Sequence, residues 1–250
     1  MPTKKTLKAA DLISDLKKLA KNTKNKSSRF HKTKKGEYGE KDIFIGVSVP
    51  KIRQQAKKYK ELTNTEIKQL LKDKIHEVRM AGLLILVEKY QKAKNKDEKK
   101  EIVGFYLANS KYINSWDLVD LSVYKILGDF LLEEAPKKAN AVLNKLASSK
   151  NMWERRMAMV STFSFIKAGR KEEVKKIAKK LMKDGEDLIH KASGWMLREM
   201  GKRIGEDELK KFLDENHKIM PKVALRYAVE KLDKKTKDLY LKAKNRITKK

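Results

Sequence analysis

The fold of this chain is most constrained by a recurring pattern of long apolar helices. In five segments, apolar residues recur at the three- and four-residue spacing of an α-helix, and the segment starts lie roughly 30 to 40 residues apart. The segments begin at Ile75, Trp116, Met152, Leu188 and Met220. Each interval leaves room for one more helix, and helix pairs at this period are typical of HEAT and armadillo arrays. The sequence therefore predicts an all-α fold, an α-solenoid of HEAT-like helix pairs.

We predict that residues 1–250 form a single HEAT-like α-solenoid domain, because each helix pair needs its neighbours to bury its apolar face. An apolar stripe predicts a first helix over residues 6–21, and Pro50 opens a later helix, since proline favours the first helical turn. Residues 21–40 are polar, basic and interrupted by glycine, which predicts a basic loop. Residues 246–250 are expected to form a frayed tail.

The charge of the chain points to a polyanionic partner. Lysine and arginine number 62 against 33 acidic residues, which gives a formal net charge of +29. In a solenoid, equivalent helices line one side, so the predicted array has a basic concave groove, and nucleic acid is the commonest partner for such a surface. The alternative is a general lysine bias that affects solubility alone.

Several classes of chemistry are disfavoured. The chain has no cysteine, which excludes disulfides and thiolate catalysis. Its apolar runs are too short to cross a bilayer, and its basic N-terminus has no apolar signal core, so we expect a cytoplasmic, nucleoid-associated protein without a membrane partner. The histidines are dispersed without metal-ligand spacing, and Asp42 is interpreted as an ordinary surface or helix-end acid. We therefore expect neither a metal nor a cofactor.

One segment is acidic where the rest of the chain is basic. It reads Asn-Ser-Trp-Asp-Leu-Val-Asp over residues 114–120 and opens an apolar helix. Trp116 and Asp120 are four residues apart and so share a helix face, which we expect to be mostly buried, whereas Asp117 is expected to lie off that face. A carboxylate on a buried face costs free energy unless it is paired or used. Asp120 is therefore a candidate functional residue.

The chemistry that suits such a carboxylate follows from its charge. It would repel phosphate, so in a basic groove it should face something cationic. The sugar of a nucleoside develops positive charge when its glycosidic bond is cleaved, and an N-alkylated purine is itself a cation. Asp120 is expected to stabilise that charge, to position a water molecule, or both.

Tryptophans and cations at the repeat helices are the other candidates. Trp153 fits a core stripe, whereas Trp195 lies at the edge of its stripe, where it could pack in the core or contact a sugar-phosphate backbone. Arg155 and Arg156 are adjacent, so only one can face the groove squarely, either for phosphate or for a salt bridge. Arg79 and Arg156 are assigned to equivalent positions of their repeats, and so are Lys191 and Lys222. A row of such cations along one side of the solenoid would attract the phosphates of a DNA duplex.

Five motifs together resemble the HEAT-repeat DNA alkylation repair family, the AlkD-like alkylpurine DNA glycosylases. They occupy residues 45–50, 114–120, 153–156, 191–199 and 221–227. The resemblance implies a monofunctional enzyme that excises N3- and N7-alkylated purines from duplex DNA without a metal or cofactor. It also implies that Asp120 is the catalytic aspartate, that Trp116 and Trp195 are active-site aromatics, and that Arg156 or Arg155 contacts phosphate.

Two other functions stay open. A non-catalytic DNA-binding solenoid has the same charge and groove, with Asp120 held in a structural ion pair. A protein-binding scaffold, a common role of HEAT arrays, would bind acidic peptides instead. In each case we expect a monomer, because no helix shows an apolar seam for a second copy.

Overall fold

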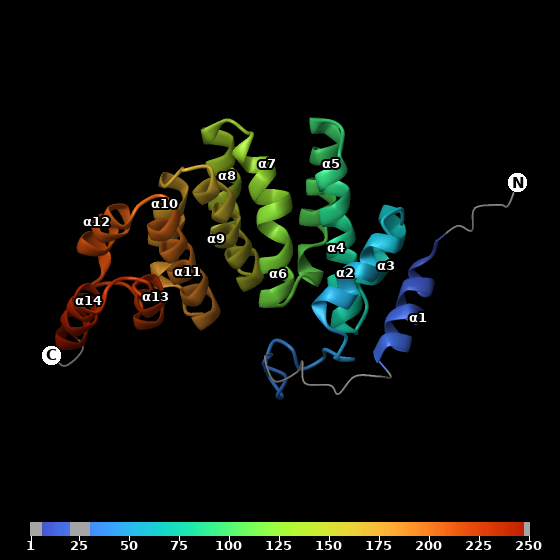
Figure 1. Cartoon of the computed structure of the whole chain (residues 1–250), viewed down its shortest axis with the longest axis horizontal. Coiled ribbons are helices and arrows are strands. Elements are labelled where there is room, and N and C mark those ends of the chain that lie inside the picture. The colour runs from blue at the N-terminus through green and yellow to red at the C-terminus, as the bar shows by residue number, and fades with distance from the viewer. Residues whose placement is uncertain (1–6, 21–30, 248–250) are drawn as a thin grey trace, which may run out of the picture. The chain divides into compact units, whose positions relative to one another are not determined.

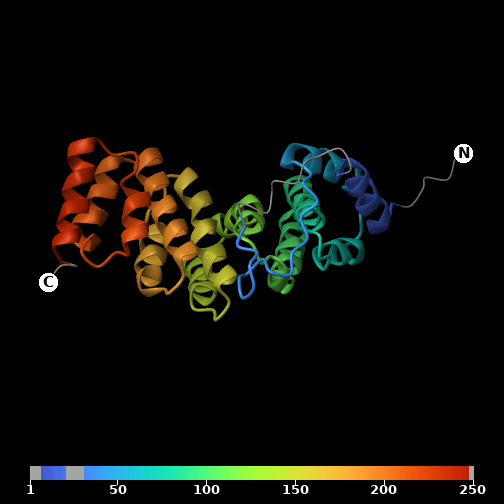
Figure 2. The same cartoon turned by 90° about the horizontal axis from the view of Figure 1, so that it is seen from below.

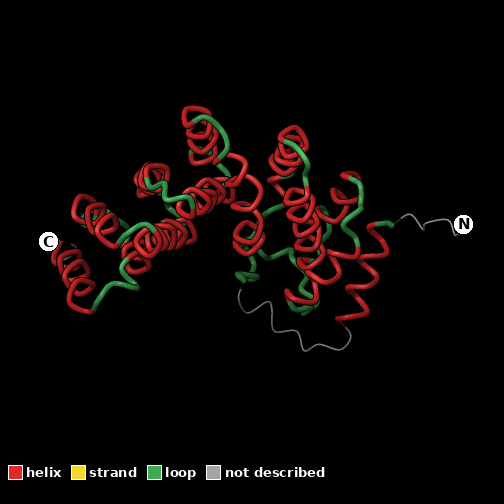
Figure 3. Tube along the Cα trace, turned by 45° about the horizontal axis from the view of Figure 1, so that its top comes forward, coloured by secondary structure: helices red, strands yellow, loops and turns green. Residues whose placement is uncertain are grey.

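A computed structural model describes residues 7–20 and 31–247 of the chain, with side chains as far as Lys242. Within these ranges every regular element is a helix (Figure 3), and the one β-bridge pairs Ile43 with Ile75. The prediction of an all-α fold is confirmed. None of the helices in these ranges has the length and apolarity needed to cross a membrane.

Contacts divide the chain into two compact units, Met1–Ser122 and Val123–Lys250. The single domain expected over residues 1–250 stays a prediction. The first unit contains α1 (Ala9–Ala20), α2 (Val49–Lys58), α3 (Asn64–Leu71), α4 (His76–Lys92), α5 (Lys96–Ala108), η2 (Ser110–Tyr112) and nearly all of α6 (Trp116–Val123).

Helix α4 is the centre of the first unit. Its sequence is apolar on every side from Met80 to Val87, and it is buried accordingly, with α1, α2, α3 and α5 packed around it. A buried helix needs no polar face, which explains the uninterrupted apolar run. Helix α3 is capped by Thr63, whose hydroxyl accepts a hydrogen bond from the Glu66 backbone N–H.

The second unit stacks helix pairs. Its elements are η3 (Tyr124–Gly128), α7 (Asp129–Leu132), α8 (Pro136–Ala147), α9 (Met152–Lys167), α10 (Glu172–Lys180), η4 (Leu181–Lys183), α11 (Asp187–Arg203), α12 (Glu206–Asn216), α13 (Lys222–Ala228) and α14 (Lys234–Ile247). Helices α9, α11 and α13 lie side by side in one layer and α8, α10 and α12 in another (Figure 1; Figure 2). Helix α9 begins at the predicted Met152, α11 and α13 begin within two residues of the predicted Leu188 and Met220, and Trp153 is in the core as expected.

The predicted loop and tail lie partly outside the described residues. Residues 21–30 of the basic loop and residues 248–250 of the tail are outside them. Residues 31–40 form turns and bends, in agreement with the loop prediction. Residues 246 and 247 are the last residues of α14.

Candidate active site

A pocket of about 620 Å³ opens in the first unit beside the start of α6. Its walls are mainly apolar and aromatic, with Phe44, Val47, Ile52, Met80 and Trp116 among them. Its polar lining consists of Ser48, two histidines and three acids; the histidines and acids are His31, His76, Glu77, Asp117 and Asp120. The predicted pair Trp116 and Asp120 therefore faces a pocket with a low-polarity wall.

The loop before α2 forms one wall because two interactions fix it to α4. The backbone N–H of Ile43 donates to the Lys74 carbonyl (2.9 Å), and the N–H of His76 donates to the Ile43 carbonyl (2.8 Å). The buried Glu77 carboxylate accepts hydrogen bonds from the N–H groups of Ile45 and Gly46. Gly46 has φ of 79°, a conformation that glycine adopts at little cost.

Within α6, the surroundings of the two acids differ from the prediction. The buried face of the helix passes through Ser115, Leu118, Val119 and Ser122. Asp120 and Trp116 lie half-buried at its edge, toward the pocket. Asp117 lies off the buried face, as predicted, but its side of α6 is covered as well, since its carboxylate accepts a 2.8 Å hydrogen bond from His76 Nε2 and is 16% exposed. The loop and α4 cover this side of α6, which helical periodicity alone does not reveal.

Asp120 acts electrostatically on its surroundings. Burial raises the pKa of the Tyr106 hydroxyl, and the negative charge of Asp120 adds to that effect. The Tyr106 hydroxyl is 2.9 Å from the Ser122 hydroxyl, a hydrogen bond that joins α5 to α6 behind the pocket. The geometry therefore places an acid where a cationic group in the pocket would meet it.

A histidine and acid cluster lies beside Asp120. His76 Nε2 contacts Asp117, and its Nδ1 lies 3.4 Å from Asp42 Oδ2. His31 Nε2 lies 3.8 Å from Asp117 Oδ2, and the His31 ring stacks on Trp116 with centroids 5.6 Å apart. The prediction that the histidines are dispersed is wrong for this pair, since chain folding brings His31 and His76 to 4.8 Å between ring centroids.

Charge and burial compete in this cluster. Burial alone would lower the pKa of His76, but its hydrogen bonds to Asp117 and Asp42 outweigh that effect and raise it. For His31, burial is the larger effect and lowers the pKa. Burial would raise the pKa values of Asp117 and Asp42, yet the hydrogen bond of each to His76 helps to bring both below their ordinary range.

Asp42 and Arg79 form a buried ion pair at the edge of the cluster. Arg79 Nη2 lies 2.6 Å from Asp42 Oδ2, and the two side chains are 5% and 7% exposed. Asp42 is therefore not the surface or helix-end acid that the sequence suggested. Arg79 also donates to the carbonyls of Asp73 and Lys74. Because these contacts hold the guanidinium of Arg79 against the turn before α4, it is badly placed to contact phosphate.

Arg155 in the second unit repeats this arrangement. It donates to the carbonyls of Ser149 and Lys150, which precede it by six and five residues, as Asp73 and Lys74 precede Arg79. It also pairs with a carboxylate, through Nη2 to Asp184 Oδ1 at 3.1 Å. Arg79 and Arg155 are each the fourth residue of their helices. The assignment of Arg79 and Arg156 to equivalent positions is therefore wrong by one residue.

The remaining predicted cations differ in accessibility. Arg156 is 5% exposed and donates to the Leu188 carbonyl, so it ties α9 to α11. Lys191 is partly exposed and pairs with Asp187 at 2.7 Å, whereas Lys222 is exposed at the first position of α13. Lys191 is the fifth residue of α11, so the expected equivalence of these two lysines is not observed.

Trp195 lies half-buried at the edge of α11, as predicted, while Ile189, Ala192, Met196 and Met200 are in the core. Its ring is 6.3 Å from that of Phe163, which in turn meets Tyr124 edge-on at 5.2 Å. Exposed cations approach this aromatic row, with Lys167 Nζ 5.9 Å and Arg203 Cζ 5.1 Å from the Phe163 ring centroid. In nucleic-acid-binding proteins, aromatic faces stack on bases and neighbouring cations pair with phosphates, and this row of side chains offers both groups.

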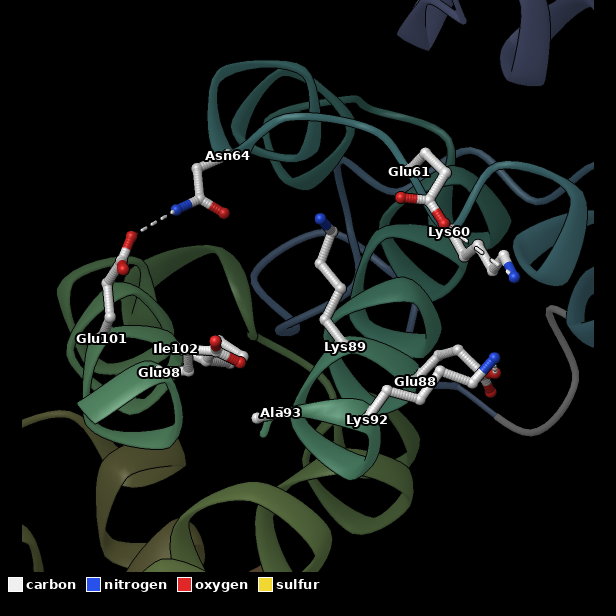
Figure 4. A pocket seen from close by; sticks show the side chains of 10 residues that line it. All are labelled: Lys60, Glu61, Asn64, Glu88, Lys89, Lys92, Ala93, Glu98, Glu101 and Ile102. Carbon is white, nitrogen blue, oxygen red and sulfur yellow. Dashed lines mark hydrogen bonds and ion pairs between the residues drawn. The ribbon is translucent and has the colours of Figure 1, made fainter. Parts of the chain in front are cut away.

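A second hollow of about 480 Å³ is lined by residues of α3, α4, α5 and the segments that precede them (Figure 4). Lysines and glutamates surround it, and Asn64 donates to Glu101 across 3.4 Å. Lys92 pairs with Glu88 at 2.7 Å. The side chains here satisfy one another in solvent, so this hollow suggests no chemistry.

Residues 12–232 match the family described as DNA alkylation repair enzyme. No protein with a curated description matches the chain. A solved structure described as a predicted DNA alkylation repair enzyme from Enterococcus faecalis is similar, with 18% identity, a TM-score of 0.61, and coverage of 93% of this chain and 100% of that one. AlkD2 from Streptococcus mutans is similar too, with 18% identity, a TM-score of 0.57, and coverage of 90% and 99%.

The family match spans most of the chain, and the chain therefore belongs to the DNA alkylation repair enzyme family. The similar structures share its helical solenoid fold. The resemblance seen in the sequence motifs is thus confirmed at the level of the family.

Sequence reasoning missed four residues of the pocket region, which are His31, Asp42, His76 and Asp117. They come from a loop, the segment before α2, and the first turns of α4 and α6. One signal was present, because His76 and Asp117 both lie in the first turn of a repeat helix, and equivalent helices of a solenoid stack side by side.

Proposed function

We propose that this protein is a DNA glycosylase that hydrolyses the N-glycosidic bond of N3- or N7-alkylated purines in duplex DNA. Family membership supports a role in repair of alkylated DNA. The observation that best supports the glycosylase step is the position of Asp120, one helical turn from Trp116 and at an apolar and aromatic pocket. An acid in such a place favours a cationic reactant.

The chemistry follows from charge. The C1′–N9 bond breaks with its electron pair going to the purine, whose positive charge is thereby neutralised. Positive charge develops at the sugar, and the Asp120 carboxylate stabilises it more strongly in a low-polarity pocket than it would in water. Water adds to C1′ and gives up a proton, for which the same carboxylate is an acceptor. The products are a free alkylated base and an abasic site.

We further propose which residues contact DNA. Trp116 packs against the sugar or base next to Asp120. Trp195, in the second unit, contacts DNA through the aromatic row that it forms with Phe163. The exposed Lys222 and the partly exposed Lys191 neutralise phosphates. Arg79 and Arg156 are buried, and their proposed role is to hold the helices that present these groups.

The test compares the wild type with Asp120→Asn on methylated duplex DNA. We expect the wild type to release N7-methylguanine and N3-methyladenine and the variant to lose at least about 100-fold in rate, because it loses the charge and keeps the shape. Asp97→Asn on the exposed first turn of α5 makes the same charge change and should leave the rate unchanged.

Binding to the same duplex separates this proposal from its rival. The variant should bind DNA as the wild type does, since Asp120 faces the sugar rather than phosphate. If the wild type binds DNA in a salt-sensitive way and releases neither base, the protein is a non-catalytic DNA-binding solenoid instead.

A further inference from the structure

We propose that His31, His76 and Asp117 bind a divalent transition metal ion, with zinc the best match. His31 lies in the turns and bends of residues 31–40, His76 in the first turn of α4 and Asp117 in the first turn of α6. Each offers one ligand atom, and the three atoms lie within 4.8 Å of one another. Two imidazoles and one carboxylate are a common ligand set for zinc and other first-row metals.

The distances within the cluster suit a tetrahedral ion. Zinc bonds of 2.0–2.1 Å at tetrahedral angles place ligand atoms about 3.3 Å apart. Asp117 Oδ2 is 2.8 Å from His76 Nε2 and 3.8 Å from His31 Nε2. These two values bracket the required separation. The ligand nitrogens of His31 and His76, which lie within 4.8 Å of each other, would have to approach by up to about 1.5 Å to complete the geometry.

Both histidines are oriented by a second partner, as metal-ligating histidines almost always are. The free nitrogen of His76, Nδ1, faces Asp42 Oδ2 at 3.4 Å. The corresponding nitrogen of His31 faces the Ser115 hydroxyl at 3.3 Å. In both rings Nε2 is thus the nitrogen directed at Asp117, which makes the cluster a convergent site rather than a chance meeting of polar groups.

The surroundings favour a cation and give it access. Asp42 and Asp117 contribute two negative charges and Arg79 one positive charge, so the site is net negative when both histidines are neutral. His31, His76 and Asp117 all line the 620 Å³ pocket, which provides an entry path and room for water at a fourth coordination position. The ligand side chains are 7%, 3% and 16% exposed, and in the absence of a metal a proton on His76 would occupy this space.

A bound ion would join three segments that are far apart in sequence. It would fix the His31 ring, which stacks on Trp116, and so hold the aromatic wall of the pocket. This inference departs from the metal-free expectation that the family resemblance implied. It does not depend on the proposed glycosylase activity, because the site is complete without DNA.

The test is metal binding by the full chain, free of any affinity tag and stripped with a chelator. Titration with Zn²⁺ in a calorimeter should show one tight site, and Co²⁺ should give the visible absorption of a tetrahedral complex. His31→Asn, His76→Asn and Asp117→Asn should each weaken binding by at least ~100-fold, and Ser115→Ala by roughly 10-fold. His217→Asn, a half-buried histidine in the second unit, should leave binding unchanged.

A variant that fails to fold would be recognised by circular dichroism, so a second measurement uses the wild type alone. Zn²⁺ should shift the side-chain ¹⁵N resonances of two histidines, at Nε2 in each, and leave the other two in place. Absence of a site tighter than about 1 mM, or binding that survives His31→Asn and His76→Asn, would overturn the proposal and leave His76 as a protonated bridge between Asp42 and Asp117.

Discussion

Asp117 and Asp120, one turn apart in α6, both line the pocket. Asp117 accepts a hydrogen bond from His76, which helps to hold its pKa below the ordinary range. Asp120 lies at the edge of α6 on the side of Trp116. Neighbouring carboxylates in different environments can take different roles. We therefore propose that Asp117 holds the cluster and that Asp120 meets the reactant.

Glu77 is the residue that most directly holds the loop against α4. Glu77→Ala leaves the N–H groups of Ile45 and Gly46 without an acceptor, so we expect the free energy of unfolding to fall by about 2–4 kcal/mol. Chemical denaturation measures it. Glu101→Ala on the exposed face of α5 removes the same side chain and should change stability by less than about 0.5 kcal/mol. Equal effects would mean that Glu77 contributes no more than a surface acid.

Individual residues show how far the sequence could predict this site. Trp195 was placed correctly at a helix edge because helical periodicity alone determines which face a residue occupies. Asp42 and His31 were misjudged because they belong to an irregular segment whose position depends on the Ile43 contact with α4. Arg156 was aligned with Arg79 by sequence likeness, whereas hydrogen bonds to the preceding turn show that Arg155 is its equivalent.

At the scale of the element, the crossing of α11 and α13 depends on the absence of a side chain. Gly194 lies where a Cβ atom would meet the Ala224 backbone and come within 2.5 Å of Tyr227 Cβ. Helices α11 and α13 can pack this closely because the residue of α11 at the crossing point has no side chain. The same residue stands in the motif around Trp195, so the packing also sets the position of that tryptophan on its helix.

Gly194→Ala should therefore destabilise the protein by about 1–3 kcal/mol, although alanine favours helix, because the backbone of α13 must move. Gly104→Ala in α5 is the matched control, since a Cβ there meets nothing within 4 Å. It should stabilise by about 0.5–1 kcal/mol. Thermal unfolding of both variants measures the contrast, and the account of the crossing is wrong if both substitutions stabilise.

Helices α10 and α12 are joined by Glu208, which meets Lys175 at 2.8 Å and Lys171 at 3.0 Å. The lysine hydrogen bonds lower the pKa of Glu208 from 4.5 to about 2. A carboxyl whose pKa is lower in the folded state stabilises the fold above its unfolded pKa, and this stabilisation is lost as pH falls through the folded value.

We therefore expect Glu208→Gln to be less stable than the wild type at pH 7, and the difference to shrink between pH 5 and pH 2. Thermal melts across that range test this. Glu186→Gln, an exposed acid before α11, is the control and should show a smaller difference with little change over the same range. If the difference in stability between the wild type and Glu208→Gln stayed constant down to pH 2, the assigned ion pairs of Glu208 would be ruled out.

At the scale of the whole molecule, the charge of +29 has consequences that single contacts do not show. Such a chain attracts any polyanion, so DNA binding by itself says little about the site. Its salt dependence says more, because each phosphate neutralised adds about 0.9 to the slope of log affinity against log salt concentration. Comparing the salt slopes of variants that each lack one cation therefore shows which helix layer contacts phosphate.

Lys222 opens α13, in the layer with α9 and α11, and Lys145 is exposed on α8, in the other layer. If the first layer contacts duplex DNA, Lys222→Ala should weaken binding and reduce the salt slope by about 0.9, whereas Lys145→Ala should leave both unchanged. Fluorescence anisotropy with one unmodified duplex at several salt concentrations measures this. Equal losses from both variants would mean that binding follows total charge and that neither layer is a specific DNA surface.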